Sequence, residues 1–411
     1  MKVWIKLLLG TLAGILAAQF LPVDNQSINA ALGWLEALSL RIGRYAVVPL
    51  LVFSLSIAVH ELRQEGRFWP MVFRSFMFIA ASGILVIAIG LVVIQIFPPG
   101  RVPIHVEEEL GTVSLDTAGN ILELFPSNMF QSLVGDGVYL FPVCVFAFFL
   151  GMGLSYDRSF SKPVITLIDS LSRIFYHITV FFSEILGFIM IVLAAYWALR
   201  FKGVLREKVY NDLIILLGGL SLGLCFILLP LFLCFLRPKV NPWVVLYGNL
   251  GPALASWFSG DINFTLPVLL RHGKENSGIR RRSNTLVLAL FNTFGRAGSA
   301  MTAAAAFILI IKSYSRLDIT LADSLSIGLR AFVISFFLAG RPGDGAYTAL
   351  ALLCLGYGRG FVEAGYLFLK PLAFYLVAIG TFLDVMIASF CSFAIARLGG
   401  YQEDKSPRHF I

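Results

Sequence analysis

Apolar stretches long enough to cross a lipid bilayer recur along almost the whole chain of 411 residues. A helix needs about 20 mainly apolar residues to span the hydrocarbon core of a membrane. Hydrophobic residues make up 58% of the chain, and charged residues make up only 14%, well below the roughly 25% of a soluble domain. The short alternating segments of a transmembrane β-barrel are not found. The sequence therefore predicts an all-α polytopic membrane protein.

Basic residues gather in the connectors that fall on one side of the predicted membrane. Arg271–Arg282 is the most basic of these connectors, whereas the acidic loop 101–120 falls on the other side. The positive-inside rule then places both termini in the cytoplasm and the chain in the cell inner (plasma) membrane. This placement accounts for the net charge of +8, so no nucleic-acid partner is expected. Four basic residues fall on the opposite side and weaken the count: Arg200, Lys202, Arg206 and Lys208.

Two apolar segments are interrupted by short polar stretches and do not fit simple membrane spans. The interruptions are Ser259–Asn263, within residues 242–270, and Gly340–Gly345, within residues 321–355. An apolar helix without such an interruption follows each segment, over about 285–311 and about 367–398. The basic connectors stay on one side only if each interrupted segment enters and leaves the membrane on the same face. Inverted pairs of such broken segments indicate a binding site at the membrane midplane of a secondary transporter.

Arg296 places a permanent positive charge inside an apolar helix, directly after the helix-loosening Gly295. A charge at the membrane centre costs roughly 2.5–3.5 kcal/mol on insertion scales and normally faces the protein interior. A guanidinium matches a carboxylate or phosphate through two parallel hydrogen bonds. Three roles are open for Arg296. It could anchor an anionic solute, replace a bound sodium by pairing with Asp384 or Asp261, or form an ion pair that only locks the domain.

Asp384 and Asn292 lie on the two helices that follow the interrupted segments. A carboxylate and an amide oxygen suit a hard cation such as sodium. A buried aspartate can instead take up a proton, because burial disfavours the charged carboxylate. A salt bridge from Asp384 to Arg296 is the third alternative. We therefore expect Asn292 and Asp384 to be ion-coupling residues. Sodium is the one candidate metal ion, and no other cofactor is expected.

Polar residues at the two interruptions are candidates for solute contact. Arg341, Gly343 and Asp344 lie at the second interruption, where glycines let backbone N–H groups point at a ligand. The charges there either contact the solute or are exposed at the tip. Asp261 and Asn263 lie at the first, where they either bind the solute or cap the flanking half-helices. A separate stripe of charged residues in the segment 164–199 is expected to pair with neighbouring helices: Asp169, Arg173, His177 and Glu184.

Three short motifs follow one another in a fixed order along the second half of the chain. They are Thr265–Leu266–Pro267, Asn292–x–x–Gly295 and Gly340–x–Pro342–Gly343–x–Gly345. In this order and spacing, and over nearly its whole length, the chain resembles the dicarboxylate/amino acid:cation symporter family, which includes the glutamate and aspartate transporters. The motifs match the end of that family's first hairpin tip, its Asn-Met-Asp-Gly-Thr sequence and its second hairpin tip.

The resemblance implies a glutamate-transporter-like elevator fold with eight transmembrane helices and two re-entrant helical hairpins, assembled as a homotrimer in the lipid bilayer. A scaffold would comprise residues 1–70 and 121–200. A moving transport domain would comprise residues 71–100 and 210–398. Within it, the implied elements are hairpin 1 at about 242–270, helix 7 at about 285–311, hairpin 2 at about 321–355 and helix 8 at about 367–398.

The chain departs from the family mainly where the family binds its ligands. Phe294 and Arg296 stand where the family motif has Asp and Thr, and Asp261–Phe264 replaces its serine-rich tip. In the last helix the family has Asp, Arg, Asn and Asp at the positions of Val377, Gly380, Asp384 and Ala388. Much of the family's sodium machinery is therefore missing, together with the carboxylate that reads an amino acid.

Some family positions are retained. Thr381 keeps its identity in the last helix, and Thr265 lies in the matched motif of the first hairpin tip, so the resemblance implies solute contacts at both. Ser82 matches a threonine that lines one of the family's sodium sites, which implies an ion contact there.

The sequence as a whole predicts a secondary active transporter, an elevator-type symporter that moves a small polar and anionic solute such as a dicarboxylate or amino acid. Sodium or protons would drive it. The alternatives are an uncoupled or proton-coupled exchanger of a different small metabolite, and a non-transporting receptor built on the same fold. An enzyme is not expected, because no nucleophile–base set or metal-ligand spacing is found. A channel is not expected either, because the polar groups do not form a continuous stripe.

Overall fold

The computed structural model describes residues 2–23, 25–101, 126–134, 137–156, 158–236, 241–314, 320–338, 345–357 and 362–411. Over these residues the chain is helical apart from its connections and one isolated bridge between Ile279 and Gln402. Seven helical stretches in the described part are long and apolar enough to span a membrane. The predicted all-α membrane class is confirmed at this level.

The chain begins with four apolar helices: α1 (Val3–Phe20), α2 (Gln26–Arg44), α3 (Val47–Gln64) and α4 (Phe68–Ile96). The sequence predicts one long helix over 31–62, and this is wrong in detail because the helix is interrupted between α2 and α3. Pro49 explains the interruption. It has no N–H to donate to the carbonyl of Tyr45, and its ring would clash with that carbonyl in a continuous helix.

The middle of the chain contains one very long helix. The 3-10 turn η1 (Met129–Leu133) and the short α6 (Phe141–Leu154) precede α7 (Arg158–Glu207), which has 50 residues. After it, α8 (Asn211–Gly223) and α9 (Leu229–Leu236) are joined by the π-helical turn η2 (Leu224–Leu228). The sequence also predicts a broken segment here, with limbs over 121–130 and 138–154. The described part of it forms η1 and α6, and residues 121–125 and 135–136 lie outside the described part.

Both interrupted segments consist of paired helices. The first contains α10 (Pro242–Gly248), α11 (Leu250–Ser259) and α12 (Ile262–Glu275), and α11 packs against α12. Gly260 ends α11 with φ +60°, a left-handed conformation that favours glycine. The second contains α15 (Leu321–Phe337) and α16 (Gly345–Tyr357), which also pack together. The connection between them, residues 339–344, lies outside the described residues.

The helix expected over 285–311 consists of α13 (Arg281–Phe294) and α14 (Ala297–Tyr314), separated at Gly295 and Arg296. The chain then forms the 3-10 turn η5 (Gly365–Leu372) and α17 (Ala373–Gly399), and ends in a tail with the short turn η6 (Pro407–His409).

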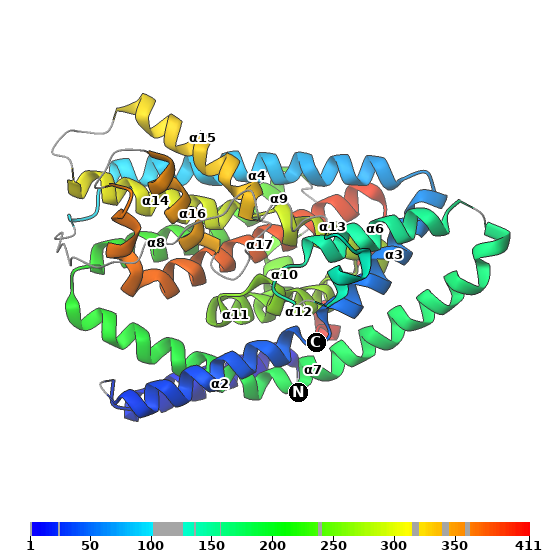
Figure 1. Ribbon diagram of the computed structural model, residues 1–411, viewed down its shortest axis with the longest axis horizontal. Coiled ribbons are helices and arrows are strands. Elements are labelled where there is room, and N and C mark those ends of the chain that lie inside the picture. The colour runs from blue at the N-terminus through cyan, green and yellow to red at the C-terminus, as the bar shows by residue number, and fades with distance from the viewer. Residues whose placement is uncertain are drawn as a thin grey trace.

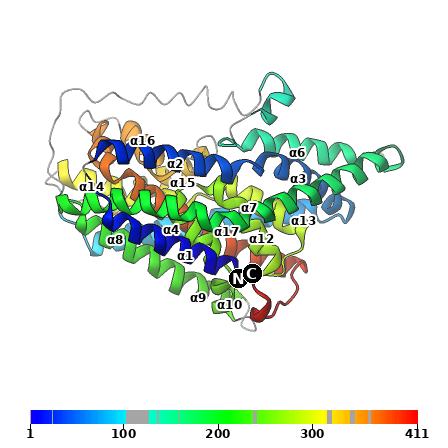
Figure 2. The same cartoon turned by 90° about the horizontal axis from the view of Figure 1, so that it is seen from below.

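The buried centre of the molecule is formed by α13, α14 and α17. Their membrane-length windows are 94% buried for α13–α14 and 100% buried for α17. Figure 1 shows α2 and α7 along one side, α4 and α15 along the opposite side, and α17 between them. The two termini lie next to each other at one end (Figure 2). The tip between α11 and α12 is therefore placed between the outer helices and the buried centre.

Candidate functional site

The break between α13 and α14 leaves the first N–H groups of α14, a buried helix, without partners in a preceding turn. The Gly295 N–H donates to the Phe291 carbonyl at 2.8 Å, and a Cβ at Gly295 would lie 2.7 Å from that same oxygen. Only glycine fits here without a shift of the chain. Because α14 starts anew after the break, its first N–H groups have no carbonyl partner within their own helix.

Asp384 of α17 provides the missing partner for the start of α14. Its Oδ1 accepts from the N–H groups of Gly298 at 2.7 Å and Ser299 at 3.2 Å, and its Oδ2 accepts from the Ser299 hydroxyl at 2.6 Å. The Asp384 residue is fully buried. A carboxylate is favourable at this position because the first turn of a helix carries partial positive charge. Asp384 therefore caps a helix far away in the sequence, and both of its oxygens are engaged.

Arg296 lies at the break itself and is only 2% exposed. Its Nε and Nη1 atoms have no hydrogen-bond partner, and no ion pair of Arg296 is found among the described residues. The negative charges of Asp384 and Asp261 act on it through space. Leaving a buried charge without a hydrogen-bonded partner is costly. The guanidinium therefore presents two unfilled donor positions in the protein interior.

The tip between α11 and α12 meets this break. Asp261 caps α12 by accepting from the Asn263 N–H at 2.8 Å and the Phe264 N–H at 3.3 Å, and its Oδ2 forms an ion pair with Arg44 of α2. The Asn263 side chain donates to the carbonyl of Val138 at 2.6 Å and accepts from Asn292 Nδ2 at 2.8 Å. The tip is thus bound to α2, to the chain before α6 and to α13.

Thr381 and Thr265, both predicted from the sequence, make further hydrogen bonds to the tip. Thr381 of α17 donates to the Gly260 carbonyl at 3.2 Å, and Thr265 donates to the Asp261 carbonyl at 2.8 Å within the start of α12. Asn292 Oδ1 is buried without a hydrogen-bond partner. The open acceptor of Asn292 and the open donors of Arg296 thus belong to residues four positions apart in the sequence, on either side of Gly295.

The structure brings together one group of the predicted site residues: Asp261, Asn263, Thr265, Asn292, Arg296, Thr381 and Asp384. We call these residues the tip–break cluster. Arg341, Gly343 and Asp344 lie outside the described residues. Ser82 donates to the Ile79 carbonyl in its own helix, α4, and lines an apolar groove between α4 and α9.

The pairing of Arg296 with Asp384 or Asp261, one of the alternatives left open by the sequence, is not found among the described residues. Asp384 accepts from Gly298 and Ser299, and Asp261 pairs with Arg44. Arg44 and Ser299 are the two site residues that the sequence analysis missed. Arg44 lies outside the basic connectors, and this position was a signal in the sequence that it has a role within the protein. A serine three residues after the Gly295–Arg296 pair was a weaker signal for Ser299.

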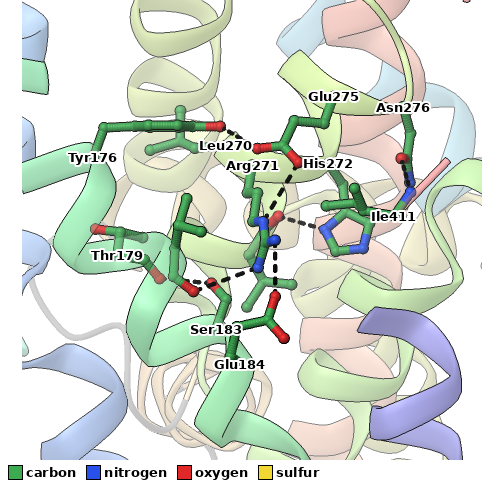
Figure 3. Close-up of polar contacts among 12 residues, drawn as sticks. Tyr176, Thr179, Ser183, Glu184, Leu270, Arg271, His272, Glu275, Asn276 and Ile411 are labelled. Carbon is green, nitrogen blue, oxygen red and sulfur yellow. Dashed lines mark hydrogen bonds and ion pairs between the residues drawn. The ribbon is translucent and has the colours of Figure 1, made fainter. Parts of the chain in front are cut away.

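The charged stripe on α7 binds the second limb of the hairpin, as Figure 3 shows. Arg271 of α12 donates to Glu184 at 3.0 Å and lies 3.6 Å from Glu275, which accepts from the Tyr176 hydroxyl at 2.8 Å. Asp169, nearer the start of α7, pairs with Arg281 of α13. The expected pairing with neighbouring helices is found for Glu184 and Asp169, which tie α12 and α13 to α7, whereas Arg173 pairs with Asp169 within α7.

Oxygen ligands for a cation are few in the described part of the chain. No three His, Cys, Asp or Glu side chains gather there into a possible metal site. Within the tip–break cluster, Asn292 Oδ1 is the buried side-chain oxygen without a hydrogen-bond partner. The open side-chain groups of the cluster, among the described residues, are therefore the Asn292 Oδ1 acceptor, which suits a cation, and the Arg296 Nε and Nη1 donors, which suit an anion.

Comparison with known proteins identifies the family of the chain. The sequence model of the sodium:dicarboxylate symporter family matches residues 1–398. The proton/sodium-glutamate symport protein of Bacillus subtilis (strain 168) is 24% identical over 369 residues, which cover 86% of this chain and 82% of that protein. Excitatory amino acid transporter 1 of Rattus norvegicus is 23% identical over 260 residues, which cover 62% of this chain and 47% of that protein. The chain therefore belongs to the sodium:dicarboxylate symporter family and is a secondary active symporter.

Proposed function

We propose that this symporter carries a small anionic solute, a dicarboxylate or an acidic amino acid, whose negative group binds Arg296 in the tip–break cluster. One observation carries the proposal. Arg296 is 2% exposed, yet its Nε and Nη1 atoms have no hydrogen-bond partner among the described residues. A carboxylate fits such a guanidinium through paired, charge-assisted hydrogen bonds. The glutamate named for the Bacillus subtilis relative is a solute of this chemistry.

The surrounding charges support an anion rather than a cation as the bound group. Asp384 is engaged by the first turn of α14 and Asp261 by Arg44, so neither carboxylate neutralises Arg296 directly. A buried cation without a bonded counter-ion attracts an anion more strongly in a low-dielectric interior than in water. Among the described residues, Asn292 Oδ1 has no hydrogen-bond partner and stays open for the coupling ion. Solute binding then satisfies the open donors of Arg296.

Coupling to sodium or protons is part of the proposal, with Asn292 and Asp384 as the coupling residues. Both side chains are buried oxygen donors on the two helices that flank the tip. The name of the Bacillus subtilis relative includes both ions. Ser82 is left out, because its hydroxyl is bonded within α4 and faces an apolar groove.

The finer architecture is proposed as an elevator with eight transmembrane helices, two re-entrant hairpins and a homotrimeric scaffold. Residues 1–70 and 121–200 form the scaffold, and residues 71–100 and 210–398 form the transport domain. The packed pairs α11–α12 and α15–α16 support the hairpins. The neighbouring termini in Figure 2 support placing both on the cytoplasmic side of the plasma membrane. Arg341, Gly343 and Asp344 would lie on the second hairpin tip, which gates the solute.

Thermal stabilisation of the purified full-length chain in mild detergent tests the solute class. Succinate, L-aspartate and L-glutamate are compared with the neutral amide L-glutamine, each with and without sodium. At least one of the three acids is expected to raise the unfolding temperature of the wild-type protein, whereas L-glutamine is expected to leave it unchanged. Uptake of the stabilising acid into proteoliposomes then checks transport.

Two variants connect the binding to Arg296. Arg296→Gln is expected to abolish the stabilisation, and Arg296→Lys, which keeps the charge but loses the planar fork, is expected to weaken it about tenfold or more. Arg330→Gln is the matched control, because Arg330 is an exposed arginine of α15 that donates to the Gly356 carbonyl. Unchanged acid binding by a folded Arg296→Gln protein would remove Arg296 from the site.

A further inference from the structure

Arg44 reaches the tip–break cluster from outside the two hairpins. It is the last residue of α2, and its Nε and Nη2 both bond the Oδ2 atom of Asp261. The side chains are 14% exposed for Arg44 and 3% exposed for Asp261. An ion pair this buried is shielded from solvent screening, so the charge of each partner is felt strongly by its neighbours.

Glycines next to Arg44 allow α2 to lie close to the tip. A Cβ on the preceding Gly43 would lie 2.1 Å from Cδ2 of Phe264, so α2 can lie this close to α12 only with glycine there. On its other side, a Cβ on Gly137 would lie 3.5 Å from the Cβ of Arg44. Gly137 and its neighbour Val138 also accept hydrogen bonds from Asn263. Arg44 is therefore enclosed by the same segments that hold the tip.

Two hydrogen-bonded routes fix Asp261 beside the break at Arg296. Asn263, two residues after Asp261, is bonded to Asn292, which lies in the last turn of α13, four residues before Arg296. Gly260, just before Asp261, is bonded to Thr381, which lies one turn before Asp384 on α17. The charge of Asp261 consequently acts on Arg296 through space. The part-buried Arg44 and the buried Arg296 thus share one neighbouring carboxylate.

We infer that Arg44 is a specificity-determining residue of the symporter: by holding the Asp261 carboxylate, it keeps that carboxylate from occupying Arg296 and so leaves Arg296 free for an anionic solute. This inference rests on the proposed anion site at Arg296. Without Arg44, the unpaired Asp261 carboxylate competes with the solute for the Arg296 guanidinium and repels the negative group of the solute. Glu36 of α2 also lies within electrostatic reach of Arg44 and Asp261.

A set of variants in the full-length protein separates this role from a structural one. Binding of succinate and L-glutamate is measured by titrating the unfolding temperature of wild type, Arg44→Gln, Asp261→Asn and the double variant. Arg44→Gln is expected to weaken binding of the stabilising acid by about tenfold or more. The double variant is expected to bind within about threefold of wild type, because it lacks the competing carboxylate.

Two further variants serve as controls. Arg41→Gln removes an exposed arginine from the same end of α2 and is expected to bind like wild type. Arg44→Lys keeps the positive charge and is expected to stay within about threefold of wild type, whether or not Arg44→Gln folds well enough to be titrated.

The outcomes are distinct. Equal binding by wild type and Arg44→Gln, a double variant as weak as Arg44→Gln, or loss of binding in Arg44→Lys would overturn the role of Arg44 while leaving the anion site in place. Wild-type protein that binds neither acid would overturn the proposed function, and the inference with it.

Discussion

The cap that Asp384 places on α14 makes a quantitative prediction about stability. Replacing Asp384 with alanine removes the acceptors of three hydrogen bonds: those from the N–H groups of Gly298 and Ser299 and from the Ser299 hydroxyl. Hydrogen bonds to a charged partner contribute about 1.5–3 kcal/mol each, and loss of a helix cap costs roughly 1 kcal/mol. These contributions are not additive, because one carboxylate serves all three donors. We expect Asp384→Ala to lower the free energy of unfolding by about 3–5 kcal/mol.

The burial of the cap is what makes the expected cost large. Gly298 and Ser299 are buried, so water cannot replace the lost carboxylate. Asp384→Ala also removes one of the two negative charges that act on Arg296. Asp384→Asn keeps an acceptor for the backbone N–H groups and is expected to lose less stability than Asp384→Ala.

Unfolding in mild detergent can be followed with a thiol-reactive dye, because Cys225, Cys354 and Cys391 are buried in the folded protein. Ser389→Ala is the matched control on α17, since the Ser389 hydroxyl is buried without a hydrogen-bond partner and its removal should cost little. The expected order of stability is wild type and Ser389→Ala, then Asp384→Asn, then Asp384→Ala. If Asp384→Ala unfolds within about 1 kcal/mol of Ser389→Ala, the assignment of Asp384 as the cap of α14 is refuted.

Three further predictions concern coupling, packing and assembly. Asp384→Asn should flatten the dependence of uptake on the driving ion, measured in proteoliposomes with imposed sodium or proton gradients; a variant that still concentrates solute against its gradient would exclude this role. Gly43→Ala should weaken acid binding by displacing α2 from Phe264, whose Cδ2 atom lies 2.1 Å from the position of the added Cβ, whereas Gly153→Ala, which meets nothing within 4 Å, should bind like wild type. Mass measurement of the purified protein in mild detergent should give a trimer, and a purely monomeric protein would contradict the proposed assembly.

The sequence predicted the class of the fold and several of its special points, because these depend on local composition. Long apolar runs indicated membrane helices, Gly260 marked the turn of the first hairpin, and Gly295 marked the break of a helix. The break between α2 and α3 was not predicted, although Pro49 explains it. Apolar side chains continue across that break, and hydropathy alone does not register a missing N–H group.

The sequence predicted which residues lie at the candidate site better than it predicted which partners they contact. Most of the residues proposed from the sequence lie together in the tip–break cluster, but their charged partners differ from those expected. Arg44 is separated from Asp261 by 217 positions and Ser299 from Asp384 by 85 positions. Hydrophobic periodicity orients each helix but does not determine which distant polar groups meet. The partner of a buried charge therefore had to come from the three-dimensional arrangement.

The cap on α14 also bears on how the protein is made. Asp384 lies 86 positions after Gly298, whose N–H group it accepts. Because a chain is synthesised from its N-terminus, α14 leaves the ribosome well before the residue that satisfies its first turn. Until α17 arrives, the start of α14 has to find other acceptors, such as water or lipid headgroups. Completion of this symporter's centre thus waits for its last membrane helix, and a chain that stops before α17 has an unfinished binding site.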